Sequence, residues 1–303
     1  SYSVSGTQMI PFYIFYSMFG FQRIGDLAWA AGDSRARGFL LGATAGRTTL
    51  NGEGLQHEDG HSHLMSATIP NCVSYDPTFA YELAVIMQEG LRRMVQNQED
   101  IYYYITLMNE NYTHPAMPKG VEAGILKGMY PFSVSKAKGP KVQLMGSGVI
   151  LREVIAAAEL LEKDWAVSAD VWSVPSFTEL RREGLDAERW NMLNPEQKPR
   201  ISYVEECLAK TEGPVVASTD YMKAFADQIR NFVPRRYIAL GTDGYGRSDS
   251  REALRSFFEV DRYYVVLAAL KALADDGKIP ASKAVEAIKK YKIDSKRPNP
   301  TSV

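Results

Sequence analysis

The sequence predicts an α/β protein whose mostly parallel sheets are covered by helices on both faces. Two observations indicate this class. Short β-branched or apolar runs alternate with longer amphipathic segments along the chain, which is the order of strands and helices in βαβ units. In addition, the run at residues 39–43 (FLLGA) is wholly apolar, as is typical of a parallel strand that is buried on both faces.

The composition gives no electrostatic reason to expect a polyanionic partner. The chain has 303 residues, a length that predicts about two domains. Its apolar content of 45% and charged content of 23% are ordinary for a globular protein. The net charge of −1 favours neither nucleic acid nor a membrane surface. No run of about 18 apolar residues occurs, so we expect no membrane span.

Cysteine usage predicts the compartment. The chain contains two cysteines, Cys72 and Cys207, which are too few for a disulfide framework. Because disulfides persist only in oxidising surroundings, their absence favours a reducing compartment. We therefore expect a cytoplasmic protein.

The first part of the chain predicts a helix, a strand and a second helix. Residues 11–31 predict a buried helix, because aromatic side chains recur there at near-helical spacing and Pro11 suits a first turn. The apolar strand at residues 39–43 follows. Asp76 and Pro77 then predict the start of a helix, as its N-cap and its first helical residue.

A strand and a linker are predicted next. Residues 101–107 (IYYYITL) are β-branched and aromatic, which predicts a strand. Residues 115–141 are rich in Pro, Gly and Lys, a composition typical of linkers between domains. We place the boundary within this stretch, so that residues 1–135 and 136–303 form the two expected domains.

After the linker the alternation of strands and helices restarts. Ser176 followed by Glu179 predicts a capping box at the start of one of these helices. The elements predicted in this half are strands at residues 142–145, 169–174, 214–218 and 237–241, and helices at residues 149–161, from 176 onward, 222–232, 249–258, 263–274 and 282–291.

The highest concentration of titratable side chains lies in residues 48–63 (TTLNGEGLQHEDGHSH). This stretch holds three of the four histidines, His57, His61 and His63, together with acidic residues and three glycines. Histidine changes its charge near neutral pH, and glycine lets the backbone approach a ligand closely. Functional residues lie disproportionately on loops. We therefore expect this loop to face an active site, with purely structural histidines as the alternative.

Part of this loop matches the zinc-protease pattern H-E-x-x-H, from His57 to His61. That motif binds zinc only on a helix, where both imidazoles lie on one face. Gly60 lies inside the motif, and no apolar helical period surrounds it. His63 as a third ligand fits no zinc spacing. The sequence therefore does not predict a zinc site here.

A second glycine-rich loop spans residues 241–249 (GTDGYGRSD), between a predicted strand and a capped helix. Its exposed backbone N–H groups and Arg247 are suited to an anion or a partner. The spacing of its acidic residues excludes a calcium loop. The shorter pattern Gly146-Ser147-Gly148 lacks the third glycine of a dinucleotide fingerprint, and we interpret it as a tight turn.

Several long runs carry a resemblance to a known family. They are MIPFYIFYSMFGFQRIGDLAWAAGDSRARGFLLGATAGRTTLNGEGLQHEDGHSH, YYYITLMNENY, SFTELRREG, VASTDYMKAFADQIR and LGTDGYGRSDSREALR. The chain resembles, over essentially all its residues, the homodimeric, single-chain type of pyruvate dehydrogenase, the first component of the bacterial pyruvate dehydrogenase complex. The resemblance implies a transketolase-like fold of consecutive α/β domains. This chain would hold the later part of the pyrimidine-binding domain and then the C-terminal domain.

The resemblance also implies thiamine diphosphate and magnesium (Mg2+) as cofactors. The family's metal motif, Gly-Asp-Gly followed by Asn-Asn, does not occur in this sequence, so the magnesium ligands are expected outside this chain. The glutamate that engages the aminopyrimidine ring would lie just before Ser1. Because the chain does not start with Met, we expect a piece of a longer protein, inactive by itself.

Four residues match the family's active site by position. His57 and Glu53 lie in the run GEGLQHEDG, where the resemblance implies catalytic residues. Tyr16 and Phe19 in YSMF match the aromatic residues that line the pyrimidine pocket. Aromatic faces suit a flat ring, and a histidine can exchange protons at neutral pH. Glu53, four residues before His57, can tune the charge of the imidazole.

The implied reaction decarboxylates pyruvate and reductively acetylates the lipoyl group of a dihydrolipoyl acetyltransferase. The expected partners are a second copy of the chain, in a homodimer, and the core and lipoyl domain of that acetyltransferase. Two alternatives stay open. One is transketolase-like transfer from a sugar, and the other is a dimerisation or complex-interaction module without activity of its own.

Overall fold

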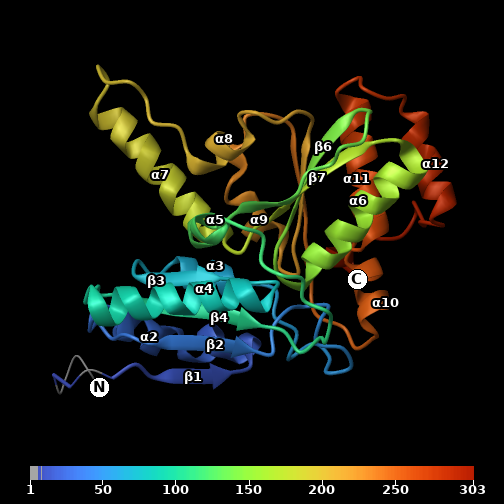
Figure 1. The fold of residues 1–303 in the computed structure, drawn as a ribbon. Helices are drawn as coiled ribbons and strands as arrows, with labels where there is room; N and C mark the ends of the chain where they lie inside the picture. Colours follow the sequence, from blue (N-terminus) through green and yellow to red (C-terminus); the bar gives the residue numbers. More distant parts are fainter. Residues whose placement is uncertain (1–5, 8) are drawn as a thin grey trace.

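The computed structural model describes residues 6–7 and 9–303. The chain forms two sheet-centred bodies, the earlier one blue to cyan and the later one green to red in Figure 1. The first sheet has the order β1-β2-β4-β3, and all its neighbouring strands are parallel. Its strands are β1 (Phe12–Phe15), β2 (Phe39–Ala43), β3 (Cys72–Tyr75) and β4 (Tyr102–Leu107). The strands predicted at residues 39–43 and 101–107 are therefore confirmed.

Helices cover both faces of the first sheet. Successive side chains of a strand point to opposite faces, and β4 follows this rule. Tyr103 and Ile105 pack with Ile86, whereas Tyr102 and Tyr104 pack with Phe21. The helical elements of this body are η1 (Ser17–Phe19), α2 (Gly20–Asp33), α3 (Ser62–Ala67), α4 (Ala80–Leu91), η2 (Arg92–Gln96, a π-helical turn) and α5 (Glu122–Lys127).

The helix predicted at residues 11–31 is wrong in its first half. Phe12–Phe15 forms the edge strand β1, paired in parallel register with β2, and the α-helix begins only at Gly20. Clustered aromatic residues favour strands as well as buried helices. Here the pairing with β2 stabilises the strand. The stretch is also not wholly buried, since Tyr13 and Ile14 are more than half exposed.

The helix start predicted at Asp76 and Pro77 is also wrong. The strand β3 runs to Tyr75, and α4 begins at Ala80 with Phe79 as its N-cap. Glu82 supplies the capping interactions, because its Oε2 accepts from the backbone N–H groups of Thr78 at 2.5 Å and Phe79 at 3.0 Å. The Asp76 side chain instead accepts from Thr106 Oγ1 at 2.7 Å.

The second sheet has the order β5-β7-β6-β8-β9, with β5 as an antiparallel edge strand. Its strands are β5 (Tyr130–Ser133), β6 (Lys141–Gly146), β7 (Ser168–Ser173), β8 (Val215–Ser218) and β9 (Tyr237–Leu240). The last four confirm the predicted strands. The stretch predicted as a linker contains both α5 and β5, so its later part already belongs to the second sheet. The division of domains at residue 135 stays a prediction.

The helices predicted in the second half are present with shifted ends, except that the helix predicted at residues 222–232 is divided into a short α-helix and a 3-10 turn. Ser176 caps its helix, since its Oγ accepts from Glu179 N–H at 3.0 Å. The predicted capping box is incomplete, because the Glu179 carboxylate pairs with Arg182 at 2.8 Å and the Ser176 N–H donates to Gly128 O instead. The helices are η3 (Gly148–Ile150), α6 (Leu151–Trp165), α7 (Phe177–Leu193), α8 (Tyr203–Leu208), α9 (Lys223–Asp227), η4 (Arg230–Phe232), α10 (Arg251–Phe257), α11 (Arg262–Asp275), α12 (Ser282–Lys290) and η5 (Pro300–Ser302).

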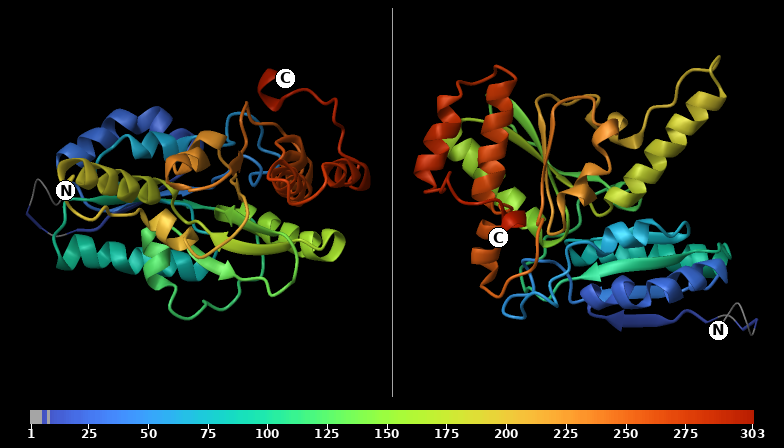
Figure 2. Two further views of the ribbon diagram at one scale, coloured as in Figure 1. Left: turned by 90° about the horizontal axis from the view of Figure 1, so that it is seen from above. Right: turned by 180° about the vertical axis from the view of Figure 1, so that it is seen from behind.

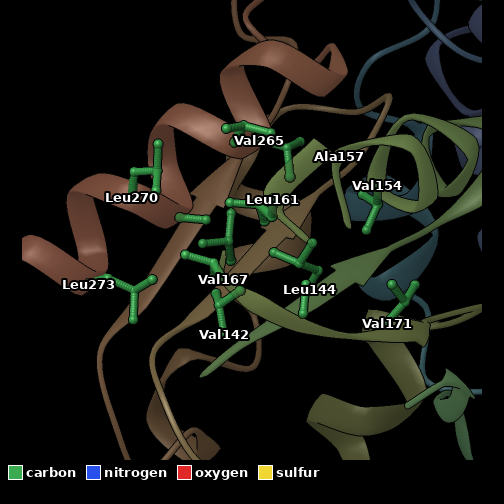
Figure 3. Packing of buried hydrophobic residues seen from close by; sticks show 14 of the residues in the cluster. Val142, Leu144, Val154, Ala157, Leu161, Val167, Val171, Val265, Leu270 and Leu273 are labelled. Atoms are coloured by element: carbon green, nitrogen blue, oxygen red, sulfur yellow. The ribbon is translucent and has the colours of Figure 1, made fainter. Parts of the chain in front are cut away.

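Two hydrophobic cores lie on the two faces of the second sheet. Val142 and Leu144 of β6 point toward α6 and α11, in the cluster of Figure 3. Met145, the next residue, points to the other face, where α7 and α9 supply residues such as Phe177 and Phe225. Figure 2 shows α7 extending away from the rest of the molecule.

The two bodies meet at the carboxyl ends of their strands. Asp76 follows β3, and its backbone N–H donates to Pro175 O, just after β7, at 2.7 Å. Gly148, after β6, donates its N–H to Asp76 O at 3.1 Å. Parallel α/β sheets bind ligands outside the carboxyl ends of their strands. The loops at this junction are therefore where an active site is expected.

We predict that Leu144→Ala lowers the free energy of unfolding by about 2–5 kcal/mol, the usual cost of a cavity in a packed core. Leu144 is fully buried between the second sheet and its helices. Urea denaturation measures the effect. Leu193→Ala, at a half-exposed position on α7, is the matched control and should change the same quantity by no more than about 0.5 kcal/mol. Equal costs for the two variants would contradict this placement of the core.

Candidate active site

The predicted active-site loop leaves the carboxyl end of β2. The residues from Thr44 to His61 form turns and bends without regular helix or strand. Ala45 N–H donates to Leu107 O at 3.0 Å, so the loop starts beside the end of β4. His57 therefore lies on irregular backbone whose conformation must be fixed by hydrogen bonds to its surroundings.

The structure brings together all four residues predicted for the site. The imidazole of His57 lies edge-on to Tyr16 and Phe19, with ring centroids 5.2 and 4.9 Å away. Glu53 Oε2 lies 3.8 Å from His57 Nδ1. Tyr16 and Phe19 come from η1 and the residue before it, and Glu53 and His57 come from the loop after β2. Two segments separated in sequence thus converge on one imidazole.

This cluster is open on one side and closed on another. The Tyr16 ring and the Glu53 side chain are each more than 40% exposed, whereas the His57 side chain is 19% exposed. His57 Nδ1 is buried and has no hydrogen-bond partner among the described residues, because 3.8 Å to Glu53 exceeds hydrogen-bond length. The exposed aromatic face can receive a flat ring. The carboxylate and imidazole beside it can exchange protons with a bound molecule.

The other two histidines of the loop lie in different surroundings. His61 lies at the N-cap position of α3, and its ring contacts the side chain of Gln22 from α2. His63 is fully buried, and burial lowers its pKa to about 3. Its two ring nitrogens lie 2.6 Å from Ser74 Oγ and 2.9 Å from Thr106 Oγ1. Its ring also stacks on Phe225 of α9, with centroids 4.8 Å apart, so we assign His63 to the packing between the two bodies.

A buried group of charges next to the loop was not foreseen from the sequence. Arg47 is 6% exposed, and Glu58 and Asp220 are fully buried. Asp220 accepts from Thr48 N–H at 2.9 Å and from Thr49 Oγ1 at 2.7 Å. Burial lowers the pKa of Arg47 and raises the pKa of Asp220. A residue pattern could not reveal this group, because Asp220 lies 172 positions after Thr48, to which it is bonded.

Glu58 connects the loop to the second body. Its Oε2 accepts from Arg247 N–H at 2.6 Å, and burial raises the pKa of this carboxyl to about 8. The Arg247 guanidinium lies over the Phe257 ring, 4.3 Å from the ring centroid. The sequence-based expectation of an anion or a partner at Arg247 stays a prediction, but its backbone N–H is already bonded within the chain.

The described residues fit one part of the expected cofactor set. The exposed face of Tyr16, next to Phe19 and His57, is a suitable surface for an aminopyrimidine ring. Among residues 6–7 and 9–303, no group of three His, Cys, Asp or Glu side chains is placed to hold a metal ion.

Comparisons with known proteins find relatives for both halves of the chain. Residues 1–115 match the family described as "Pyruvate dehydrogenase E1 component middle domain", and residues 128–261 match "Transketolase-like TK C-terminal domain". The pyruvate dehydrogenase E1 component of Cupriavidus necator is 69% identical over 305 residues, and that of Pseudomonas aeruginosa is 68% identical over 302 residues. These alignments cover 100% and 99% of this chain but 34% of each relative. The chain thus spans about a third of the length of these relatives.

Solved structures show the same fold at low sequence identity. The transketolase of Leishmania mexicana superposes with a TM-score of 0.64 at 18% identity, covering 91% of this chain and 36% of that one. The transketolase of Campylobacter jejuni gives 0.63 at 17% identity, covering 87% and 36%. Within the part of the chain that the structure describes, no helix is both long and apolar enough to cross a bilayer.

We predict that the melting temperature of Glu58→Gln, relative to the unchanged protein, rises as the pH rises from 5 to 8. The folded protein keeps a proton on Glu58 up to about pH 8, whereas the unfolded chain releases it near 4.5. Between these values the unfolded state binds fewer protons, so the free energy of unfolding of the unchanged protein falls with pH. Glutamine does not titrate, yet it keeps an acceptor for the Arg247 N–H.

Thermal unfolding followed by circular dichroism at pH 5, 7 and 9 measures this difference. Asp164→Asn is the control, because the hydrogen bond with Lys290 holds the pKa of Asp164 below its ordinary value of 3.8. Asp164 therefore does not titrate between pH 5 and 9. The difference in melting temperature between Asp164→Asn and the unchanged protein should stay constant over this range. A constant difference for Glu58→Gln as well would contradict the raised pKa.

Proposed function

Because the chain belongs to the pyruvate dehydrogenase E1 component family and matches the C-terminal part of its members, we propose that it is part of a thiamine-diphosphate-dependent enzyme that decarboxylates pyruvate. The acetyl group would pass to the lipoyl group of a dihydrolipoyl acetyltransferase. The observation that carries the proposal is the convergence of Tyr16, Phe19 and Glu53 on the imidazole of His57.

Tyr16 and Phe19 are proposed to bind the cofactor ring. Both side chains are held by η1, directly after the edge strand β1, so their position is coupled to the first sheet. A flat heteroaromatic ring gains from contact with aromatic faces at little cost in side-chain entropy, because each aromatic side chain has few rotatable bonds. When bound, thiamine diphosphate supplies the electron sink for the carbon atom that loses carbon dioxide.

His57 is proposed to orient the 2-oxo acid and to exchange a proton with it. Its Nδ1 faces Glu53, so the carboxylate can accept a proton from Nδ1 when the imidazole rotates slightly toward it. That arrangement leaves Nε2 as the nitrogen that meets the substrate. Glu53 would thereby hold the imidazole in this orientation.

The remaining parts of the proposed enzyme lie beyond these residues. Magnesium would be bound by residues outside this chain, and the working protein would be a homodimer in the cytoplasm. The partners would be the core and the lipoyl domain of the acetyltransferase. Because the chain spans about a third of its relatives' length, we propose that it is inactive without the rest of such an enzyme.

A transketolase-like transfer from a sugar is the weaker alternative. The transketolase structures share 17–18% identity with this chain, a level that supports the fold alone. The E1 components share 55–69% identity over nearly the whole chain. Assays with pyruvate and an artificial electron acceptor, compared with a ketose phosphate donor, separate the two reactions. Turnover of the ketose alone would overturn the proposed function.

We predict that His57→Ala lowers the rate of pyruvate decarboxylation at least about tenfold, the lower end of the range for acid–base residues. The variant is made in an E1 component of the relatives' full length that carries these residues. Steady-state decarboxylation and reductive acetylation of a free lipoyl domain are measured. His114→Ala is the matched control, because His114 stacks on Tyr112 away from the site loop. An unchanged rate in His57→Ala would leave His57 a structural role only.

We also predict that Phe19→Ala weakens thiamine diphosphate binding about threefold to tenfold, the range expected from the loss of one aromatic contact. Titration of the cofactor against the quenching of intrinsic fluorescence measures its affinity without turnover. Phe12→Ala removes another half-exposed aromatic side chain, on β1, and should leave the affinity unchanged. Equal affinities for all three proteins would contradict a stacking role for Phe19.

A further inference from the structure

Arg47 lies where the loop that carries His57 meets the second body. It follows β2, its side chain is buried, and its segment is the blue loop beside the orange segment that leads to α10 (Figure 1). Its Nη1 donates to Thr242 O at 2.9 Å and also to Gly244 O. These two carbonyls belong to the loop after β9, about 195 residues further along the chain.

The same guanidinium packs against the backbone three residues after His57. A Cβ atom placed on Gly60 would come within 2.4 Å of Arg47 Cζ, so the glycine is needed for this close approach. Gly60 O in turn accepts from Met222 N–H at 2.8 Å. One side chain thus contacts the His57 segment on one side and the loop after β9 on the other.

Further contacts hold the same segment against the second body. Glu58, next to His57, accepts from Arg247 N–H at 2.6 Å. Asp220, after β8, accepts from the backbone and hydroxyl of Thr48 at 2.9 and 2.6 Å. The segment from Thr44 to His61 has no regular structure of its own. Its conformation therefore depends on these bonds to residues more than 170 positions away.

Four carboxyl groups lie around Arg47, those of Asp59, Asp220, Glu58 and Asp243. A planar guanidinium can donate along several fixed directions and lie flat against the backbone of Gly60, whereas a lysine is a single compact charge. Lysine at this position would keep the charge but lose the close packing of the guanidinium carbon and nitrogens against Gly60.

We propose that Arg47 is a positioning residue, which holds His57 at its place in the site by joining the His57 loop to the loop after β9. This inference rests on the proposed function of His57. The second body of the chain then sets the geometry of a residue that the first body carries. A displacement of about 1 Å in a reacting group can cost about a hundredfold in rate, so a loosened loop is expected to reduce turnover strongly.

The test uses the full-length E1 component with Arg47→Lys and, separately, Gly60→Ala. The alanine pushes the guanidinium away without changing any charge. Each variant should lower kcat for pyruvate at least about tenfold while KM changes less than about threefold, because proton exchange rather than binding is disturbed. In a His57→Ala background, Arg47→Lys should lower kcat by no more than about twofold further, since residues that act as a unit are not additive.

Two controls separate positioning from general stability. Arg182→Lys removes a matched arginine of α7, which also bridges the two bodies by donating to Cys72 O at 2.8 Å and Ile69 O at 3.0 Å. Gly25→Ala adds a methyl group where no atom lies within 4 Å. Neither should change kcat by more than about twofold, as expected of changes that touch no reacting group.

Hydrogen exchange of the backbone amides gives a readout that does not need turnover. Residues 51–61 should exchange faster in Arg47→Lys and Gly60→Ala than in either control, with β6 unchanged in all proteins. Unaltered exchange in residues 51–61, a kcat equal to that of the unchanged enzyme, or an equal loss in Arg182→Lys would each overturn the role of Arg47. An unchanged enzyme that does not act on pyruvate would overturn the proposed function instead, and hydrogen exchange would still decide on Arg47.

Discussion

The contact between the two sheet-centred bodies contains buried hydrogen bonds, and the candidate active site depends on them. At the carboxyl ends of the strands, buried hydroxyls and carboxyls bond across the junction, as Thr48 does with Asp220 and Thr78 with Gly148 O at 2.6 Å. An apolar contact of the same size would tolerate small slides of one body over the other. Buried polar groups do not, because each lost hydrogen bond leaves an unsatisfied group at a cost of about 1–3 kcal/mol. The junction therefore fixes the loop that carries His57.

The sequence revealed the strands of the fold better than the points where they begin and end. The run at residues 39–43 is a strand with the predicted bounds, since a short uninterrupted apolar stretch suits a sheet that is covered on both faces. Residues 12–15 have a mixed pattern, and the neighbouring β2 made them a strand. Asp76 has the chemistry of an N-cap, yet it lies between the two bodies, where Thr106 and Gly148 use its side chain and backbone. Local signals could not reveal such distant partners.

In the candidate site, too, some residues could be predicted from the sequence and others could not. Tyr16, Phe19, Glu53 and His57 were assigned by resemblance, and they converge as that assignment required. Arg47 and Glu58 were not singled out, although both lie within eleven positions of His57. Each looks like an ordinary surface charge in the sequence, and only burial and hydrogen bonds to a distant loop distinguish them. A family resemblance thus identifies residues proposed to contact a substrate more readily than the residues that hold them in place.

The edge strand β1 bears on how this chain behaves in solution. Within the described residues it pairs only with β2, and Phe12, Tyr13 and Ile14 are each about half exposed or more. An apolar edge with free N–H and C=O groups is a template for adding a further strand, from another molecule if nothing else covers it. Leu27 and Trp29 of α2 add exposed apolar surface nearby in the sequence. The 303 residues alone would therefore be prone to self-association and poor solubility, and their handling would call for dilute samples or a covering partner.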